Sequence, residues 1–402
     1  MITRLEVENF YSIRQAQSLD LRIAENVPPI AGRFGEAFPG SRERVPKVLS
    51  IFGPNASGKS KVLKAVAFLA WFVQHSFQLL PDAPQPCESF NDEEAASLPT
   101  RLALHFGAPA NLVEPREESC AKYVYEVSFR SDSGKPKAVA SETLRQWPAT
   151  GGKAIRVFER DAQGEVRFGR GFGLSGYRQV LSKVRANASL IATLAQFDHG
   201  PSLLLQKMAA SIITNTFIEK VDLAESNVLR FYADNPQMVD ALNRDIERID
   251  LGIKAMSIES SSGGPVARFE HEGLASPMPI QLESHGTRQF IRIFPLLVQA
   301  LTVGGVAIID ELDLAIHPAV LPEILRWFYD PKRNPHSAQL WMSCHNASLL
   351  DDLVKEEIYF CEKDFHGRTR VYGLQDIQSV RRNDNYYQKY MGGVYGAVPQ
   401  LG

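Results

Sequence analysis

The stretch that decides the fold is GPNASGKS, residues 53–60, which fits the pattern G-x-x-x-x-G-K-[ST]. The apolar run VLSIF before it predicts a buried strand, and a helix is expected to follow. Glycines let such a loop turn so that successive backbone N–H groups point at phosphates, while a lysine adds positive charge. This stretch therefore predicts a triphosphate site with Mg²⁺ on the Ser60 hydroxyl. Its expected nucleotide-binding residues are Gly53, Asn55, Ser57, Gly58, Lys59 and Ser60.

Composition narrows the class of protein. The chain has 402 residues with 44% hydrophobic content, which is typical of a globular protein with a real core. Its 44 basic and 46 acidic residues give a net charge of −2, so no global field attracts nucleic acid or an anionic membrane. The net charge does not exclude a local basic patch. The 4 cysteines lie outside C-x-x-C spacing, and there is no long uncharged apolar run. We expect a cytoplasmic protein without a membrane partner.

Changes in pattern along the chain indicate four parts. Strand-like alternation precedes the phosphate loop, and a loop rich in Pro, Ser and acidic residues is expected at 81–100. Several β-like runs then give way to helical periodicity, and a Ser/Gly linker is expected at 257–264. The four parts are a nucleotide-binding N-terminal part (1–100), a β-rich subdomain (101–175), a helical insert (176–256) and a second nucleotide-binding part (257–402).

A second nucleotide-binding motif is GGVAIIDE, residues 304–311. It combines a turn, a continuous apolar strand and two carboxylates at the carboxyl end of that strand, where ligands bind in parallel α/β sheets. The pattern predicts that Asp310 holds Mg²⁺ and that Glu311 orients and deprotonates the attacking water. The alternative is a strand that merely ends in a solvated Asp-Glu pair, and the phosphate loop upstream favours the nucleotide site.

The segment ESHGTRQF, residues 283–290, opens a helix with apolar residues at helical spacing. Ser284 and Gly286 place a hydroxyl and free backbone donors at the start of this helix, and Thr287 follows them. A helix start of this kind suits a γ-phosphate that another subunit presents. The alternative is an N-cap on an ordinary core helix.

His345 is a further candidate for the phosphate site. It ends the apolar strand QLWMSC, and the strand, helix and strand between residues 306 and 345 should bring it to the same sheet edge as Glu311. A histidine there can donate a hydrogen bond to the phosphoryl group, although a lone strand-end histidine is often structural. A thiol dyad with Cys344 is excluded, because neighbours on a strand point to opposite faces.

Taken in order, these motifs resemble those of the ATP-binding-cassette (ABC) class of P-loop ATPases. More narrowly, the chain is similar to bacterial AAA family ATPases of the AAA_15/AAA_21 group, relatives of overcoming-lysogenisation-defect and SMC-like ATPases. The resemblance rests on LEVENFYSIR, ESHGT, DELDLAIHP, SCHNASLL and YMGGVYGAVP. It implies an α/β P-loop NTPase of ABC type with a mixed sheet. It also implies a β-rich and helical insert between the phosphate loop (Walker A, residues 53–60) and the signature segment at Ser284 and Gly286. It also implies that Asp313 is the D-loop residue.

The resemblance further implies what the protein does. It implies ATP hydrolysis with Mg²⁺ in a head-to-tail dimer, in which the Ser284 segment of one copy contacts the ATP on the phosphate loop of the other. For this family, the expected setting is a bacterial anti-phage or abortive-infection system. The expected partner is a separately encoded toxin or nuclease, for example of the TOPRIM type, which the ATPase controls as a switch or scaffold.

Other functions are weighed against this one. An SMC-like ATPase of DNA repair or chromosome maintenance would clamp DNA and needs a basic groove. Candidates for that groove are Lys332, Arg333, Arg381, Arg382 and Lys389. A transporter motor would need membrane partners and an LSGGQ-like signature. A nucleotide-binding scaffold without turnover is disfavoured because Glu311 is present.

Overall fold

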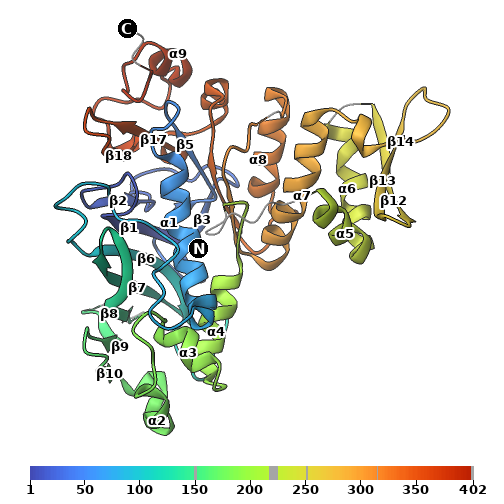
Figure 1. The fold of residues 1–402 in the computed structure, drawn as a ribbon. Helices are drawn as coiled ribbons and strands as arrows, with labels where there is room; N and C mark the ends of the chain where they lie inside the picture. The colour runs from blue at the N-terminus through green and yellow to red at the C-terminus, as the bar shows by residue number, and fades with distance from the viewer. Residues whose placement is uncertain (149–151, 217–224, 250–251, 315, 400–402) are drawn as a thin grey trace.

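A computed structural model of the chain contains two large sheets that share one helix, α1 (Lys59–His75), between them (Figure 1). None of the described helices is long and apolar enough to cross a lipid bilayer. The arrangement of the two sheets and α1 positions the phosphate loop, which joins a strand of one sheet to this helix. The residues that the structure describes are 1–148, 152–216, 225–249, 252–314 and 316–399.

The central sheet has six strands, five of which run parallel. Every residue of its three middle strands β15, β16 and β5 is buried, because both faces of the sheet are covered. This double burial explains why the sequence of these strands is mostly apolar, with Ser50, Gln339 and Ser343 as buried polar exceptions. In spatial order the strands are β11 (Ile212–Thr214), β15 (Val306–Ile309), β16 (Gln339–Ser343), β5 (Val48–Phe52), β17 (Ile358–Lys363) and the antiparallel β18 (Thr369–Gly373).

The second sheet is antiparallel and has seven strands. Strand β6 pairs with β1, so the β-rich stretch 101–175 shares one sheet with the N-terminal strands and does not stand as a separate sheet. A shorter pair, β3 (Phe34–Glu36) and β4 (Arg44–Pro46), lies outside it. In spatial order the seven strands are β10 (Val166–Phe168), β9 (Ile155–Arg160), β8 (Lys135–Trp147), β7 (Cys120–Asp132), β6 (Thr100–Pro109), β1 (Ile2–Glu8) and β2 (Gln17–Asp20).

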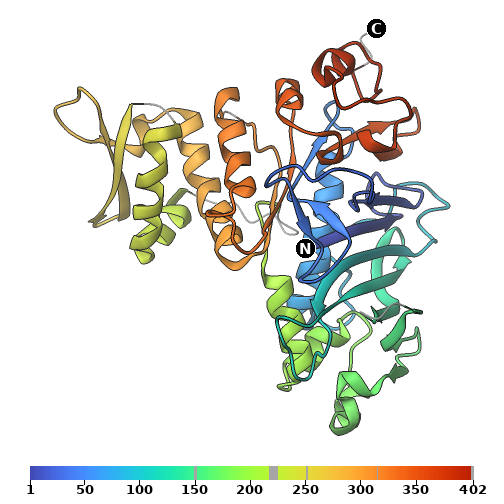
Figure 2. The ribbon, with the colours of Figure 1, turned by 180° about the vertical axis from the view of Figure 1, so that it is seen from behind.

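Helix α1 and two further helices cover the faces of the central sheet. Successive side chains of β5 point to opposite faces of the sheet and so enter two different hydrophobic cores. Leu49 and Ile51 share a core with α1 and the seven-stranded sheet, whereas Val48 and Phe52 belong to the core on the other face. Figure 2 shows the seven-stranded sheet and the covering helices on opposite sides of the central strands. Those helices are α7 (His285–Val303) and α8 (Leu321–Tyr329).

The helical insert expected at 176–256 is divided by a strand. Two of its helices, Leu190–Ala195 and Gly200–Ala210, pack beside α1, and its last two pack against a hairpin at the opposite end of the molecule. Between them, Ile212–Thr214 forms β11 and pairs in parallel with β15. The helical prediction is wrong here because three β-branched residues complete the edge of the central sheet. The helices are α2 (Arg178–Leu181), α3 (Leu190–Ala195), α4 (Gly200–Ala210), α5 (Glu225–Asp234) and α6 (Pro236–Ile249).

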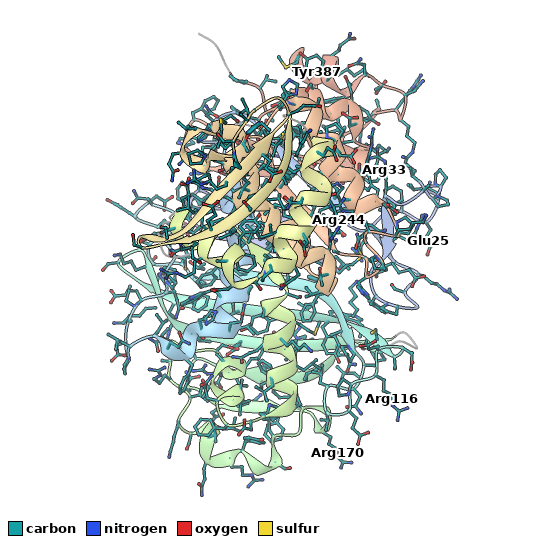
Figure 3. The ribbon with its side chains drawn as sticks, turned by 90° about the vertical axis from the view of Figure 1, so that its right-hand side faces the viewer. Glu25, Arg33, Arg116, Arg170, Arg244 and Tyr387 are labelled. Atoms are coloured by element: carbon teal, nitrogen blue, oxygen red, sulfur yellow. The ribbon has the colours of Figure 1, made fainter. Side chains whose placement is uncertain are left out.

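The Ser/Gly linker expected at 257–264 is also wrong, because these residues belong to a β-hairpin. Strand β12 (Ile253–Ser261) pairs with β13 (Gly264–His271), which pairs with β14 (Met278–Pro279). The serines of β12 are exposed, so their polarity reflects a solvated strand face. Figure 3 shows this hairpin beside α6, which carries the labelled Arg244.

The last described helix, α9 (Tyr386–Met391), packs over the central sheet near the phosphate loop. The ring of Tyr390 stacks on Phe360 of β17 with centroids 5.3 Å apart, and it lies 6.5 Å from the ring of Phe52. Figure 3 places Tyr387 of this helix at the opposite end of the molecule from Arg170. The carboxyl-terminal residues therefore support the strands that flank the loop.

Candidate functional site

The phosphate loop lies between β5 and α1, as the sequence predicts. Gly53 has φ 147° and Gly58 has φ 109°, and Ala56 adopts φ 61°. A Cβ on Gly53 would lie 2.2 Å from the carbonyl oxygen of Cys361, and one on Gly58 would lie 2.2 Å from Thr369 Oγ1. Both glycines are therefore required by backbone conformation and by close packing.

Lys59 folds back onto its own loop. Its Nζ donates to the carbonyl oxygens of Gly53 (2.8 Å) and Pro54 (3.0 Å) and lies 3.5 Å from His345 Nδ1. Burial lowers the pKa of Lys59, and nearby acidic groups oppose that shift. A desolvated ammonium held by neutral groups is well suited to exchange the carbonyl oxygens for the stronger charge of a phosphate.

Asp310 and Glu311 follow the buried strand β15, at its carboxyl end. Ser343 of the adjacent strand β16 joins them: its hydroxyl donates to Asp310 Oδ1 at 2.5 Å and accepts the Glu311 N–H at 2.7 Å. Glu311 has φ 53°, a left-handed conformation that is uncommon outside glycine. The Ser343 hydroxyl therefore supports both the Asp310 carboxylate and the strained backbone of Glu311.

Asn215, which follows β11, binds the backbone of Asp310. Its Oδ1 accepts the Asp310 N–H at 2.7 Å, and its Nδ2 donates to the Asp310 carbonyl at 2.9 Å. The sequence did not single out Asn215 or Ser343. The only available signals were a polar residue after a β-branched run and a serine two positions before His345, and both are common.

Glu311 and His345 meet at the carboxyl edge of the central sheet. Glu311 Oε1 lies 3.9 Å from His345 Nε2, and the side chains are 49% and 38% exposed. Asp313 fixes the backbone beneath them, because its Oδ2 accepts the N–H groups of His345 (2.8 Å) and Asn346 (2.7 Å). The structure thus brings Lys59, Asp310, Glu311, Asp313 and His345 to one edge, and it leaves Glu311 and His345 open to solvent.

The segment predicted to be the signature, with Ser284, Gly286 and Thr287, lies at the start of α7. Ser284 is the N-cap, and its Oγ accepts the N–H of Thr287 at 3.0 Å and lies 2.8 Å from the Thr287 hydroxyl. Just before it, the buried Glu283 contacts His271 of β13, with Oε1 2.7 Å from Nε2. Among the hydrogen bonds of the described residues, none joins Ser284 or Thr287 to the phosphate loop of the same copy.

The residues suggested for a DNA-binding groove are largely neutralised. Three of the five candidates form salt bridges with carboxylates, and Arg333 also stacks on the ring of Trp327. Paired cations offer little net charge to a phosphate backbone. The pairs are Arg333 with Asp245, Arg382 with Glu356, and Lys389 with Asp384.

The residues present fit a Mg²⁺-bound triphosphate. The loop has glycines where a Cβ would collide, Lys59 is bound within the loop by carbonyl oxygens, and the buried Ser57 hydroxyl has no partner among the described residues. Ser60, in the first turn of α1, and Asp310 supply the one hydroxyl and one carboxylate that Mg²⁺ takes from a protein in such sites.

Comparison with known proteins agrees with this geometry. Residues 48–351, about three quarters of the chain, match the family AAA_21, described as "AAA domain, putative AbiEii toxin, Type IV TA system". The chain belongs to the AAA_21 family. This membership confirms the predicted recognition and the predicted α/β P-loop fold of ABC type, and it makes the chain a P-loop ATPase by family.

Solved structures of SMC heads resemble this AAA_21 protein at low sequence identity. The SMC head bound to the C-winged helix domain of ScpA is 12% identical, with a TM-score of 0.48, and the alignment covers 92% of this chain and 97% of that one. The SMC head domain from Thermotoga maritima is 13% identical, with a TM-score of 0.38 and coverages of 92% and 98%. The SMC head from Pyrococcus furiosus bound to the C-terminal domain of ScpA is 13% identical, with a TM-score of 0.44 and coverages of 92% and 96%. No curated protein sequence matches the chain significantly.

Proposed function

We propose that this AAA_21 protein hydrolyses ATP at the edge formed by Gly53–Ser60, Asp310, Glu311 and His345. The observation that carries the proposal is the convergence of three charged or polar groups on one sheet edge. Lys59 Nζ lies 3.5 Å from one ring nitrogen of His345, and Glu311 Oε1 lies 3.9 Å from the other. A cation, a hydrogen-bond donor and a base within this reach are the groups that phosphoryl transfer to water requires.

Each residue has a distinct task in the proposed reaction. The loop N–H groups and Lys59 bind the phosphates, and Ser60 and Asp310 hold Mg²⁺, which neutralises charge on the transferred phosphoryl group when bound. Glu311 accepts a proton from the attacking water, and His345 donates a hydrogen bond to the phosphoryl group. Ser343 and Asn215 keep Asp310 and Glu311 aligned, because both of their side chains bind the backbone or carboxylate at this corner.

We propose that a second copy completes the site. Glu311 and His345 are open to solvent, while Ser284 and Thr287 cap a helix whose start makes no hydrogen bond to the phosphate loop among the described residues of its own copy. Exposed apolar side chains stand beside both halves: Leu282 is 68% exposed before Ser284, and Leu314 is 49% exposed after Asp313. A head-to-tail dimer would cover these side chains and bring a helix N-terminus to the phosphate.

We further propose that the ATPase cycle controls a partner in bacterial anti-phage defence or abortive infection. The family description names a type IV toxin–antitoxin system, and such a system has two components by definition. ATP-driven closure and release of a dimer would then set when a toxin or nuclease, for example of the TOPRIM type, is active.

Phosphate release from ATP tests the catalytic part of this proposal. The wild-type protein should release phosphate in a Mg²⁺-dependent reaction, and Lys59→Ala should reduce turnover by about 100-fold or more. Wild-type protein that neither binds nor hydrolyses ATP would refute the proposal.

For the cellular role, the chain and its neighbouring gene should be expressed separately and together. Phage plaquing and growth that do not depend on Glu311 would contradict the switch.

A further inference from the structure

Thr369, the first residue of β18, contacts the phosphate loop from a distant part of the chain. Its side chain is buried, at 3% exposure, and its Oγ1 lies 2.9 Å from the carbonyl oxygen of Ser57 and 2.8 Å from Ser12 Oγ. The Thr369 N–H also donates to the Ser12 carbonyl at 2.7 Å. Two segments that are 357 residues apart therefore meet at the loop.

The bond to Ser57 has a direct consequence for phosphate binding. The Ser57 carbonyl and the Gly58 N–H belong to one peptide unit, and cis peptide bonds are absent from the described residues. In a trans peptide these two groups point in opposite directions. A hydroxyl that holds the carbonyl outward therefore turns the Gly58 N–H inward, toward the position of the phosphates.

Packing around Gly58 strengthens this constraint. Gly58 adopts φ 109°, and a Cβ built on it would lie 2.2 Å from Thr369 Oγ1 and 2.7 Å from Thr369 Cγ2. The threonine thus fills the space in which a side chain at residue 58 would stand. On the other side of Ser12, the ring of Tyr11 lies 4.5 Å from Lys61 Nζ and 5.0 Å from Lys64 Nζ, both on the first two turns of α1.

Neither Ser12 nor Thr369 belongs to the region that matches the family. Ser12 precedes residue 48, and Thr369 follows residue 351. The loop itself contains no side chain that binds the Ser57 carbonyl, because its lysine is held at Gly53 and Pro54. The conformation of the peptide between residues 57 and 58 therefore depends on residues outside the nucleotide-binding motifs.

We propose that Ser12 and Thr369 form a latch that sets the phosphate loop in its nucleotide-receiving conformation, with Thr369 as a positioning residue. The inference rests on the proposed function, because it assigns the latch to ATP binding at the same site. Thr369 touches neither the water nor the transferred phosphoryl group in this assignment. Its loss should weaken nucleotide binding and leave the chemical step intact once ATP is bound.

The test compares variants that differ by one hydroxyl. Thr369→Val keeps the shape of the side chain and removes the bond to Ser57, whereas Thr369→Ser keeps the hydroxyl. Thr3→Val is the matched control, because Thr3 is fully buried and its hydroxyl has no hydrogen-bond partner in the part of the chain that the structure describes. Two measurements are made on the full chain: hydrogen exchange of the segment 53–62 without nucleotide, and the Kd and kcat for ATP.

Thr369→Val should speed exchange of the Ser57 and Lys61 amides, which donate to Pro54 and Gly58. It should also raise the Kd for ATP about tenfold, equivalent to ~1.4 kcal/mol, with kcat at saturating ATP within about twofold of the wild type. Thr369→Ser and Thr3→Val should match the wild type, and Ser12→Ala should shift both readouts in the same direction as Thr369→Val.

Two outcomes separate the latch from the proposed function. Thr369→Val with wild-type exchange and wild-type affinity overturns the latch, whatever the ATPase activity. Equal defects in Thr369→Val and Thr3→Val also overturn it, since the effect would then be general loss of a buried hydroxyl. If hydrogen exchange of the loop is faster in Thr369→Val than in Thr369→Ser and Thr3→Val, but the wild-type protein binds no ATP, the loop conformation is set as inferred and the ATPase assignment fails.

Discussion

Asn215 exchanges two hydrogen bonds with the backbone of Asp310, accepting its N–H at 2.7 Å and donating to its carbonyl at 2.9 Å. An amide side chain that satisfies both backbone groups of one residue fixes that residue as a further strand pairing would. Asn215 follows β11, so two hydrogen bonds connect the edge strand of the central sheet to Asp310, the proposed Mg²⁺ ligand.

Asn215→Ala should therefore impair both folding and turnover. Removing the amide leaves two backbone groups of Asp310 without protein partners, which should cost about 1–3 kcal/mol of unfolding free energy. We expect ATP turnover to fall about tenfold through misalignment of Asp310 and Glu311. Denaturant unfolding and steady-state phosphate release check these values. Asn215→Asp, which keeps the acceptor and loses the donor, should be impaired too, and unchanged turnover in both variants would contradict the account.

Sequence patterns correctly predicted where the phosphate loop and the helix start at Ser284 lie, because each is a local signal. A glycine loop between an apolar strand and a helix, and a serine at the start of a periodic helix, depend on neighbouring residues only. The same reasoning placed His345 and Glu311 at one edge from the strand order that parallel connections impose. The distances between these groups required the structure.

The supporting residues could not be found in this way. Asn215 lies 95 positions from Asp310, and Thr369 lies 312 from Ser57, so their partners are set by tertiary packing. Strand β11 escaped detection because Ile212–Thr214 continues a helical pattern, and its partner β15 is far along the chain. The β12–β13 hairpin was hidden by exposed serines that also fit a linker.

Ser343 and Ser50 offer a matched pair on adjacent strands. Ser343 bonds to Asp310 and to the Glu311 N–H, whereas the buried Ser50 hydroxyl has no partner. Ser343→Ala should lower ATP turnover about tenfold, since each hydrogen bond to a charged group contributes about 1.5–3 kcal/mol. Ser50→Ala should leave turnover unchanged. Equal effects of the two substitutions, measured by phosphate release, would show that Ser343 acts by packing alone.

Glu311→Gln should separate ATP binding from hydrolysis. The amide cannot accept the proton of the attacking water, so turnover should fall by about 100-fold or more while ATP affinity changes little. Size-exclusion chromatography with ATP should then show a dimer that persists. Glu117→Gln, at an exposed position, is the control. A Glu311→Gln protein with wild-type turnover would mean that another group is the base.

Glu357 should make stability depend on pH. It is fully buried beside Arg33, with Nη1 2.6 Å from Oε2, and burial raises the pKa of Glu357 from 4.5 to about 7. Because the folded state holds this proton more tightly, its stabilising effect is fully present below pH 4.5 and is lost as the pH rises through about 7.

Glu357→Gln cannot titrate, so the two proteins should diverge across that window. Relative to Glu357→Gln, the wild-type free energy of unfolding should fall by up to about 1.4 kcal/mol per pH unit between pH 4.5 and about 7. Urea unfolding at several pH values measures the difference. Glu117→Gln, at an exposed position, is the control, and parallel pH profiles for the wild type and Glu357→Gln would contradict the assignment.

Mixing two inactive variants tests the shared site most directly. Lys59→Ala disables the phosphate loop and keeps the signature, whereas Ser284→Arg blocks the signature and keeps the loop. In a mixed head-to-tail dimer, one of the two sites regains an intact loop from one copy and an intact signature from the other. We predict that each variant alone is nearly inactive and that a mixture recovers ATP turnover. No recovery on mixing, or full turnover by Ser284→Arg alone, would contradict a site built from two copies.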